Sequence, residues 1–325
     1  MNRKEKRLAS FLAGKYQKIE QMAYNCIMIH TLNKRSMKKL FFLVLICLTG
    51  GQTFSQGINI PGLQHPESVA YDGEFYYVSN IGLEPIPTAE DGDGFITKIS
   101  ADGLIVDRLF LPRRGKLNAP KGMSVIGKIL FVTDINKVYG FTLNKKRKKV
   151  FEIEIPESNF LNDLEPLNQH EILVSAPDVD AIFKIDILQK TYTKLNIEGS
   201  VNGPNGLDYD EGDNTLYVVG VGTNNQANGK IGKVKLDSTS MRYEILSDYQ
   251  GHLDGLFIYQ NTLVFTDWIQ FGERAGALKR LNLGTNEVTE IVGKIEGPAD
   301  IYYNYETGQL WMPVMMGNRV FRMDY

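Results

Sequence analysis

Cysteine is scarce in this chain, and its scarcity excludes a zinc finger and a domain held together by disulfides. The sequence of 325 residues holds only two cysteines, Cys26 and Cys47. No cluster of cysteine and histidine has the spacing of a zinc finger. Because both cysteines precede residue 56, we expect the domain that follows to contain no disulfide, even in an oxidising compartment.

A surplus of positive charge is also absent. The 36 Lys and Arg residues are balanced by 38 Asp and Glu residues, which gives a net charge of -2. Phosphate binding usually needs a basic surface, so we predict no nucleic-acid partner. The chain also lacks a Gly-x-Ser-x-Gly segment and a recognisable Ser-His-Asp order, which argues against acyl transfer through a serine.

One apolar run near the amino end has the layout of a secretory signal. Lys38 and Lys39 precede a continuous apolar stretch over residues 40–48, and Thr53 and Ser55 flank a cleavage point before Gln56. The stretch is about half of the ~20 residues that a spanning helix needs. We therefore predict a signal peptide at 37–55, a periplasmic or secreted product, and no stable membrane anchor after cleavage. We interpret residues 1–36 as a mis-annotated extension, with Met37 as the true start.

The remaining sequence, residues 56–325, contains six similar units. Each unit opens with a four-residue frame: usually a Pro or a Leu, then a variable residue, a small or polar residue, and an apolar residue. The frames begin at Pro66, Pro120, Leu161, Pro204, Leu253 and Pro298. Their apolar fourth residues are 54, 41, 43, 49 and 45 residues apart, which is the length of a propeller blade.

Further apolar segments follow each frame and are separated by turn residues such as Asp72-Gly73. We therefore predict an all-β fold, a six-bladed β-propeller. The last unit stops at Tyr325 after its third strand, while residues 56–63 supply an unmatched strand. We predict that this amino-terminal strand completes blade six and leaves no exposed sheet edge at the seam. The alternatives are a two-sheet sandwich and a two-domain chain.

The variable residues of the six frames should converge, because the innermost strands of a propeller all start at one rim of its central channel. These residues are Glu67, Lys121, Asn162, Asn205, Asp254 and Ala299. Carboxylate and amide oxygens from separate blades would bind a hard divalent cation, and calcium is the ion we expect. The alternative is a set of polar turn caps around a wet channel, in which Lys121 neutralises the carboxylates without a metal.

The frames resemble those of the regucalcin (senescence marker protein) and gluconolactonase family, which is related to paraoxonase and diisopropyl fluorophosphatase. The similar segments lie in order at blade spacing and are His65–Tyr71, Asn159–Asp163, Pro204–Tyr209 and Leu253–Leu256. The resemblance covers residues 56–325, blade for blade. It implies a six-bladed propeller with a metal at its axis, and it is less specific for the reaction.

The resemblance also implies roles for individual residues. Glu67, Asn205 and Asp254 would bind the metal, and Asn162 would be a fourth ligand or a substrate contact. Asp254 would also be the catalytic residue, as general base or nucleophile. Two positions depart from the family. Phe160 replaces an Arg that holds sugar hydroxyls in the lactonases, and Lys121 replaces a catalytic His of the paraoxonase type. Phe160 therefore favours a less polar ligand than a sugar lactone.

Loops between the second and third strands should lie on the same rim as these residues. The loop Asp267–Gly276 carries Trp268 and Arg274, which we expect to contact substrate together with Lys121, Phe160 and Asn162. The loop would be either a lid with a charge clamp or a segment folded over the rim by its own aromatics. We interpret His252 as part of a surface linker. The basic run 145–149 is interpreted as a solvated turn or as a contact for an anionic surface.

These features together favour a divalent-metal-dependent hydrolase of the lactonase or esterase type, with a small molecule as its substrate. The cation would polarise the substrate and lower the pKa of a bound water. A carboxylate would then take the proton or attack directly. The alternative is a non-catalytic exported propeller that binds a small ligand or a protein through its rim loops, because propellers host many functions.

Overall fold

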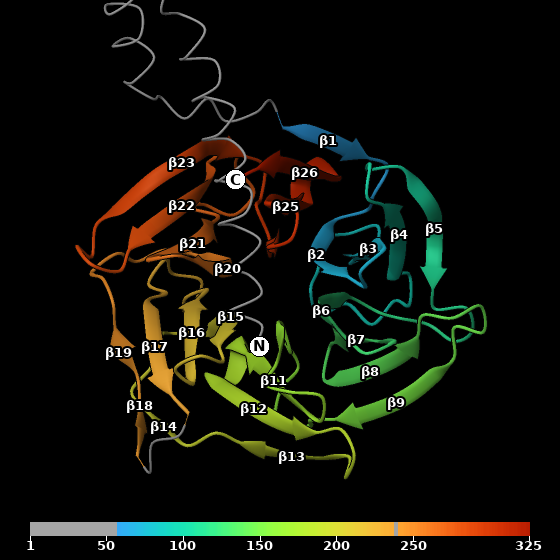
Figure 1. Ribbon diagram of the computed structural model, residues 1–325, viewed down its shortest axis with the longest axis horizontal. Helices are drawn as coiled ribbons and strands as arrows, with labels where there is room; N and C mark the ends of the chain where they lie inside the picture. Colours follow the sequence, from blue (N-terminus) through green and yellow to red (C-terminus); the bar gives the residue numbers. More distant parts are fainter. Residues whose placement is uncertain (1–56, 237–239) are drawn as a thin grey trace, which may run out of the picture.

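The described part of the chain forms a ring of six four-stranded antiparallel sheets around one axis (Figure 1). The structure is a computed structural model that describes residues 57–236 and 240–325. Each of these sheets is one blade, and in blades one to five the strands are ordered across the sheet as they are in the sequence. The predicted six-bladed β-propeller is therefore confirmed. The predicted extension (1–36) and signal peptide (37–55) lie outside the described residues.

Blades one to three follow the first three frames. Blade one contains β2 (Pro66–Tyr71), β3 (Phe75–Asn80), β4 (Phe95–Ser100) and β5 (Ile105–Leu111). Blade two contains β6 (Pro120–Ile126), β7 (Ile129–Asp134), β8 (Lys137–Thr142) and β9 (Lys149–Glu154). Blade three contains β10 (Leu164–Pro166), β11 (Glu171–Ala176), β12 (Ala181–Asp186) and β13 (Thr191–Lys194).

Blades four to six complete the ring. Blade four contains β15 (Pro204–Asp210), β16 (Thr215–Gly220), β17 (Ile231–Lys235) and β19 (Glu244–Ile245). Blade five contains β20 (Leu253–Tyr259), β21 (Thr262–Asp267), β22 (Gly276–Asn282) and β23 (Val288–Ile295). Blade six contains β24 (Tyr302–Asn304), β25 (Gln309–Val314), β26 (Arg319–Asp324) and β1 (Ile58–Pro61). The short pair β14 (Ile197–Glu198) and β18 (Met241–Arg242) is parallel, and two 3₁₀ turns, η1 (Pro177–Val179) and η2 (Met315–Gly317), follow β11 and β25.

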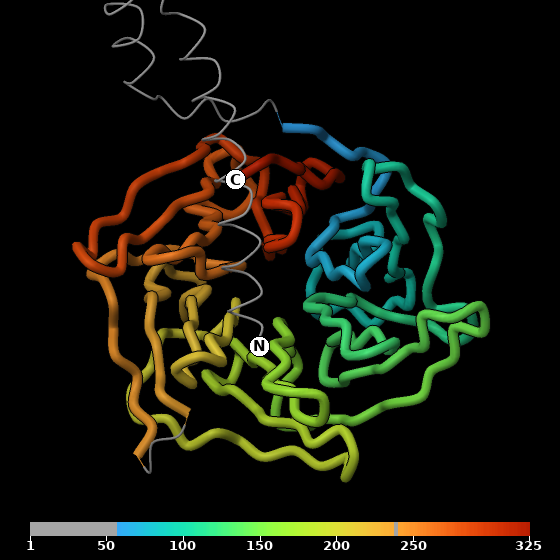
Figure 2. The backbone as a smooth tube through the Cα atoms, in the orientation of Figure 1, coloured from blue at the N-terminus to red at the C-terminus, as the bar shows by residue number. Residues whose placement is uncertain are grey.

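The ring closes where the two ends of the described chain meet. Strand β1 pairs antiparallel with β26, with Ile58 opposite Arg322 and Pro61 opposite Arg319. The tube in Figure 2 shows this meeting, because the blue start of the chain runs along the outside of the red final strands. The predicted closure by the amino-terminal strand is confirmed, and it leaves the outer edge of β26 paired.

Burial explains why the blade strands do not alternate strictly between polar and apolar residues. All residues of β16 are buried, and in β3, β7, β11, β21 and β25 only the first residue is not. Both faces of these second strands are covered by neighbouring blades, as expected for a stacked arrangement. The outer strands β5 and β9 carry many exposed residues. None of the helices in the described residues is long and apolar enough to cross a membrane.

Candidate functional site

In four blades, a β-bulge at the start of the innermost strand contains the variable residue of the frame. In blades one, two, four and five the register between the first two strands shifts within the frame, as between Pro66 and Val69. The second and third residues of the frame therefore leave the regular ladder, which re-aims their side chains. Hydroxyl groups of the second strand replace ladder bonds there: Ser79 Oγ accepts the Ser68 N–H at 2.9 Å, and Thr266 Oγ1 accepts the Gly255 N–H at 2.9 Å.

The second frame positions form what we call the axial ring. Its members are all buried and are Glu67, Lys121, Asn162, Asn205, Asp254 and Ala299. They come from the innermost parts of six different blades, and those strands contact one another around the axis. The structure therefore brings together all four predicted metal ligands and Lys121.

The third frame positions form what we call the seam ring: Ser68, Gly122, Asp163, Gly206, Gly255 and Asp300. These residues join each blade to its neighbour. A Cβ added at Gly122 would lie 2.4 Å from the Asn162 carbonyl oxygen of the next blade, so only glycine fits there. The two acids bind across the seams: Asp163 Oδ2 accepts the Leu207 N–H at 2.7 Å, and Asp300 Oδ2 accepts the Ser68 hydroxyl at 2.7 Å. Sequence reasoning assigned no role to Asp163 or Asp300.

Hydrogen bonds hold both carboxylate oxygens of Asp254 in the axial ring. Its Oδ2 accepts the Trp268 Nε1–H at 2.8 Å, and its Oδ1 accepts the Asn205 Nδ2–H at 3.2 Å. Burial raises the pKa of Asp254 to about 7, although the hydrogen bond from Trp268 lowers it, and the negative charge of Asp163 raises it further. This carboxyl group can therefore exchange a proton near neutral pH.

Two oxygens of the axial ring have no hydrogen-bond partner. They are Glu67 Oε2 and Asn205 Oδ1, and both are buried. Burial raises the pKa of Glu67 well above its usual range, and the negative charges of Asp254 and Asp300 add to the effect. Burying such oxygens without a partner is costly, so the axial ring holds acceptor atoms that the described residues leave unsatisfied.

Lys121 is fully buried in the same ring. Its Nζ donates to the carbonyl oxygens of Pro87 and Ala119, both at 2.9 Å. Burial lowers the pKa of Lys121 to about 8, while the charge of Glu67 raises it. The ammonium forms no ion pair within 4.0 Å with a carboxylate of the described residues, so it neutralises the ring only at a distance. Two of its three N–H donors are used by the carbonyls.

Phe160 lies beside this lysine. Its ring centroid is 5.5 Å from Lys121 Nζ, a cation–π distance. Asn162 is buried two residues further along, and its backbone carbonyl accepts bonds from Gly122 N–H and the Thr133 hydroxyl of blade two. Phe160 and Asn162 therefore lie with Lys121 at the junction of blades two and three.

The loop after β21 places its two predicted substrate contacts in different surroundings. Trp268 is buried and bound to Asp254, and its ring is 5.2 Å from that of Phe271. Arg274 is exposed, with Nε donating to the Lys294 carbonyl oxygen and its guanidinium 3.4 Å from Glu296. The structure thus joins Trp268 to the axial ring and does not join Arg274 to it. Of the two interpretations of this loop, the packed aromatics match the loop that folds over the rim.

His252 is not part of a surface linker, contrary to our interpretation. Its side chain is buried, one ring nitrogen, Nδ1, lies 2.9 Å from the Val221 carbonyl oxygen, and Phe271 stacks at 4.2 Å. The carboxylate of Asp267 accepts its backbone N–H at 3.1 Å and thereby fixes the approach to β20. This packing could not be predicted from the sequence, because Val221 and Phe271 lie in other loops.

An apolar cluster borders the axial ring and is called the rim cluster here. Its buried members come from blades one, two, five and six and are Ile81, Ala119, Ile135, Trp268, Ala299 and Met315. Ala299 belongs to both groups, and Trp268 links them, since its indole packs in the cluster while its N–H donates to Asp254. The surroundings of Asp254 are therefore apolar on one side and acidic on the other.

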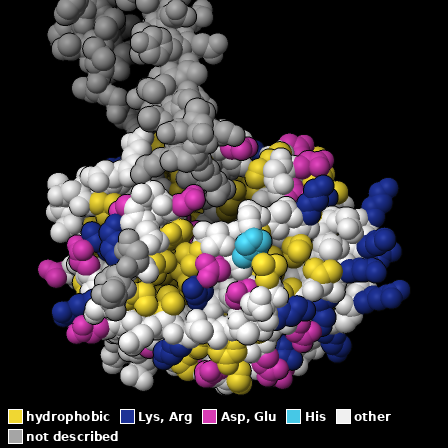
Figure 3. Space-filling view, turned by 60° about the horizontal axis from the view of Figure 1, so that its bottom comes forward, with side chains coloured by type: hydrophobic (Ala, Val, Ile, Leu, Met, Phe, Trp, Pro, Cys, Tyr) yellow, Lys and Arg dark blue, Asp and Glu magenta, His cyan; other side chains and the backbone are white. Residues whose placement is uncertain are grey.

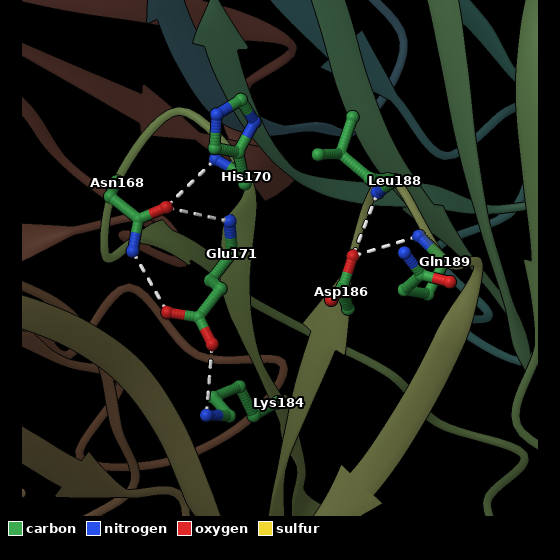
Figure 4. Close-up of polar contacts among 7 residues, drawn as sticks. All are labelled: Asn168, His170, Glu171, Lys184, Asp186, Leu188 and Gln189. Carbon is green, nitrogen blue, oxygen red and sulfur yellow. Dashed lines mark hydrogen bonds and ion pairs between the residues drawn. The ribbon is translucent and has the colours of Figure 1, made fainter.

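A depression at the turns between β10 and β11 and between β12 and β13 is lined by Asn168, Gln169, His170, Glu171, Asp186 and Leu188. Figure 4 shows the polar contacts at these two turns. The polar atoms of the depression bind one another. Asn168 Oδ1 accepts the N–H groups of His170 and Glu171, and Asp186 Oδ1 accepts that of Leu188. These bonds stabilise two adjacent turns and leave no convergent polar group for a ligand. The axial ring is the stronger candidate site.

No group of three or more His, Cys, Asp or Glu side chains within residues 57–236 and 240–325 is arranged to hold a metal ion. Any metal at the axial ring would therefore need the amide oxygens of Asn162 and Asn205 as well as the carboxylates. Such mixed oxygen sets suit calcium more than zinc or copper.

Fold and site together define a β-propeller with a polar axis. No family model matches the chain, and no curated protein matches it. Solved structures share its fold at low sequence identity. A Bacteroides thetaiotaomicron protein of unknown function has a TM-score of 0.56 at 13% identity, over 83% of this chain and 72% of that one. An inactive variant of Staphylococcus aureus virginiamycin B lyase, solved with quinupristin, has a TM-score of 0.54 at 17% identity, over 84% and 99%. The β-propeller domain of Myceliophteria thermophila Cps50 (Swd1) has 0.54 at 12%, also over 84% and 99%.

Proposed function

We propose that this protein is a divalent-metal-dependent hydrolase of the lactonase or esterase type that acts on a small molecule at the propeller axis. The observation that carries the proposal is the pair of unpartnered buried oxygens, Glu67 Oε2 and Asn205 Oδ1, in the ring that also holds Asp254. Unsatisfied acceptors beside acids of raised pKa fit a site that lacks its positive charge. Glu67, Asn205 and Asp254, with Asn162, would hold the ion, and calcium fits these donors.

Asp254 and Lys121 would contribute proton transfer and substrate binding to the reaction. When bound, the cation would polarise the carbonyl oxygen of the substrate and lower the pKa of a coordinated water. Asp254 would take the proton of that water or attack the carbonyl carbon, and its hydrogen bonds to Trp268 and Asn205 hold both carboxylate oxygens in place. Lys121 has one further N–H that could bind a substrate oxygen.

The apolar surroundings of Asp254 support a substrate with an apolar part. Phe160 and the rim cluster, including Trp268, offer aromatic and aliphatic contacts rather than donors for sugar hydroxyls. An aryl or alkyl ester, or an acyl-substituted lactone, suits these contacts better than a sugar lactone does. Among the propellers of similar fold, one is named a lyase and was solved with quinupristin. This likeness supports small-molecule chemistry on such a ring but transfers no reaction, since fold alone does not set function.

A second candidate function is ligand or protein binding without catalysis. The buried ammonium of Lys121 favours it, because the charge of Lys121 already offsets part of the charge of Glu67. In that case the ring would need no ion.

Both candidate functions include export to the periplasm or to the outside of the cell. This prediction depends on the signal pattern at 37–55. Mass spectrometry of the native amino terminus tests it: a start at Gln56 supports export, and peptides from residues 1–36 in mature protein contradict it.

The hydrolase proposal is tested with a panel of aryl esters and lactones. We expect turnover that EDTA abolishes and calcium restores, and a loss of at least about 100-fold in kcat/KM in Asp254→Asn, the range for removing a general base. Asp324→Asn, which removes an exposed carboxylate far along β26, is the matched control and should keep full activity. Equal rates in wild type and Asp254→Asn would refute the mechanism, and the absence of any turnover would favour the binding function.

A further inference from the structure

The outer edge of blade two carries an unusual surplus of positive charge. Between Asp107 and Glu152 the chain contains twelve Lys and Arg residues and a single acid, Asp134, which is buried. The protein as a whole has a net charge of -2. One of the twelve, Lys121, is buried in the axial ring. The other eleven cations lie in blades one and two of a molecule whose net charge is negative, and such asymmetry orients a protein toward a negatively charged partner.

Two segments build this edge and are held together. The turn between β8 and β9 docks on β5 through Arg147, whose guanidinium lies 2.8 Å from Asp107, donates to the Phe110 carbonyl at 3.1 Å, and stacks on the Phe110 ring at 4.1 Å. Arg113, in the loop after β5, donates to the Lys145 carbonyl at 3.4 Å. The side chains on the turn are therefore presented by a fixed support.

Five of the exposed cations on these segments form what we call the basic edge, and none of them has a carboxylate within 4.0 Å among the described residues: Arg113, Arg114, Lys145, Lys146 and Lys148. Their neighbours Arg147 and Lys149 are paired with Asp107 and Glu152. Figure 3 shows Lys and Arg side chains projecting together from the right-hand edge, where Figure 1 places the turn between β8 and β9. Clustered cations repel one another, so this edge is more favourable beside an anionic surface than in water.

We propose that the basic edge docks the protein reversibly on a membrane surface that contains anionic phospholipid. Exposed apolar side chains stand beside the cations: Leu109, 60% exposed, precedes the loop, and Val150, 44% exposed, follows the turn. Cations flanked by apolar side chains suit a lipid interface, where headgroups bind the charge and the acyl boundary accepts the apolar groups. The aromatic side chains of these segments, Phe110, Phe141 and Phe151, are buried, so the edge offers no stacking platform for single-stranded nucleic acid.

The test is co-sedimentation of the purified full chain with vesicles. We expect binding to vesicles of mixed phosphatidylglycerol and phosphatidylcholine but not to phosphatidylcholine alone. Lys145→Glu combined with Lys146→Glu should weaken binding at least about tenfold, since each surface cation near anionic lipid contributes substantially. The matched control reverses two exposed charges at blade three, Lys190→Glu with Lys194→Glu, and should retain most of the affinity. All variants share the same amino-terminal segment, so differences in vesicle binding between them report on the basic edge alone.

Two further measurements separate lipid from soluble polyanions. Leu109→Ser with Val150→Ser should weaken vesicle binding severalfold and leave the binding of heparin or DNA unchanged. Raising the ionic strength from about 0.1 M, where the Debye length is about 10 Å, to about 1 M should release the wild type. Vesicle binding that survives the Lys145 and Lys146 reversals would overturn the proposal. The proposal would also be overturned if heparin or DNA bound as tightly as vesicles did and the serine substitutions left vesicle binding unchanged.

Discussion

The axial ring and the seam ring occupy adjacent positions at the start of each blade, and their acids are all buried, yet their polar atoms are satisfied differently. In the seam ring, both oxygens of Asp163 accept backbone N–H groups, from Leu164 and Leu207. In the axial ring, Glu67 Oε2 and Asn205 Oδ1 accept nothing. Because buried polar atoms usually have a partner, the unsatisfied acceptors of the axial ring fit a place where another group binds. The seam ring therefore stabilises the propeller, and the axial ring is where we place its chemistry.

The largest expected effect comes from removing charge from the axial ring. Glu67→Gln should lower kcat/KM by about 10³-fold if a metal supplies the several kcal/mol typical of such catalysis. The free energy of unfolding of the metal-free protein should stay equal or rise, because the change replaces an unpaired buried carboxylate by a neutral amide. Activity assays and urea unfolding measure the two effects, and Glu74→Gln in an exposed turn is the control. A strong loss of stability with unchanged turnover would reverse the assignment of this residue.

Removing a seam acid should lower the stability and leave the turnover unchanged, which is the opposite of the effect expected for Glu67→Gln. Asp163→Ala leaves the Leu164 and Leu207 N–H groups without an acceptor, and each unsatisfied buried donor costs about 1–3 kcal/mol. We expect the free energy of unfolding to fall by about 2–4 kcal/mol, while the folded fraction keeps its kcat. Denaturant unfolding and active-site titration measure this difference. Asp324→Ala, with an exposed side chain, should change stability by less than about 0.5 kcal/mol.

A smaller effect is expected from the link between the rim cluster and Asp254. Trp268→Phe keeps an aromatic ring but removes the N–H that lowers the pKa of Asp254. The acid limb of the pH profile of kcat/KM should move upward by up to about one unit, and activity at pH 7 should fall severalfold. Trp311→Phe is a matched control, because Trp311 is buried against Tyr76 in a different apolar cluster from Trp268. A profile that shifts equally in both variants would contradict the positioning role.

The smallest effect is the pH dependence of stability without metal. Burial raises the pKa of Asp163 to about 6 and that of Asp254 to about 7. The folded state therefore binds more protons than the unfolded state between about pH 4 and 7, and the free energy of unfolding should rise as the pH falls from about 8 to 5. With saturating calcium the trend should reverse, because protons then compete with the ion. Chemical unfolding at several pH values, with EDTA or calcium, measures both trends. The same slope under the two conditions would argue against a metal at these carboxylates.

Local patterns in the sequence predicted the fold and the members of the axial ring. The frames recur at blade spacing, and the missing strand of the last unit is present at residues 56–63, so blade count and closure follow from the chain itself. The six variable residues share one position in the repeat, which is why they could be placed around one axis. The four motifs of the resemblance marked Glu67, Asn162, Asn205 and Asp254, and their role as ligands stays a prediction.

Contacts between blades could not be predicted in the same way. Trp268 and Arg274 lie in one loop and were expected to act together, but Trp268 binds Asp254 while Arg274 binds Glu296. Asp163 looked like part of an Asn-Asp motif, and its acceptor role depends on Leu207, which lies 44 residues away in the next blade. The bulges that aim the axial ring depend on hydroxyls of the second strands, such as Ser79 and Thr266. Such pairings depend on three-dimensional register, which no single blade encodes.

The most direct test of the axial ring is the metal content of the purified protein. Wild type and Asp254→Ala would be desalted and compared by elemental analysis. The account predicts one tightly held divalent ion, calcium, in the wild type and its loss in the variant, with the fold retained. A folded wild-type protein that holds no ion after dialysis against calcium would contradict it. Lys121 would then supply the positive charge of the ring, and the protein would be a binding propeller.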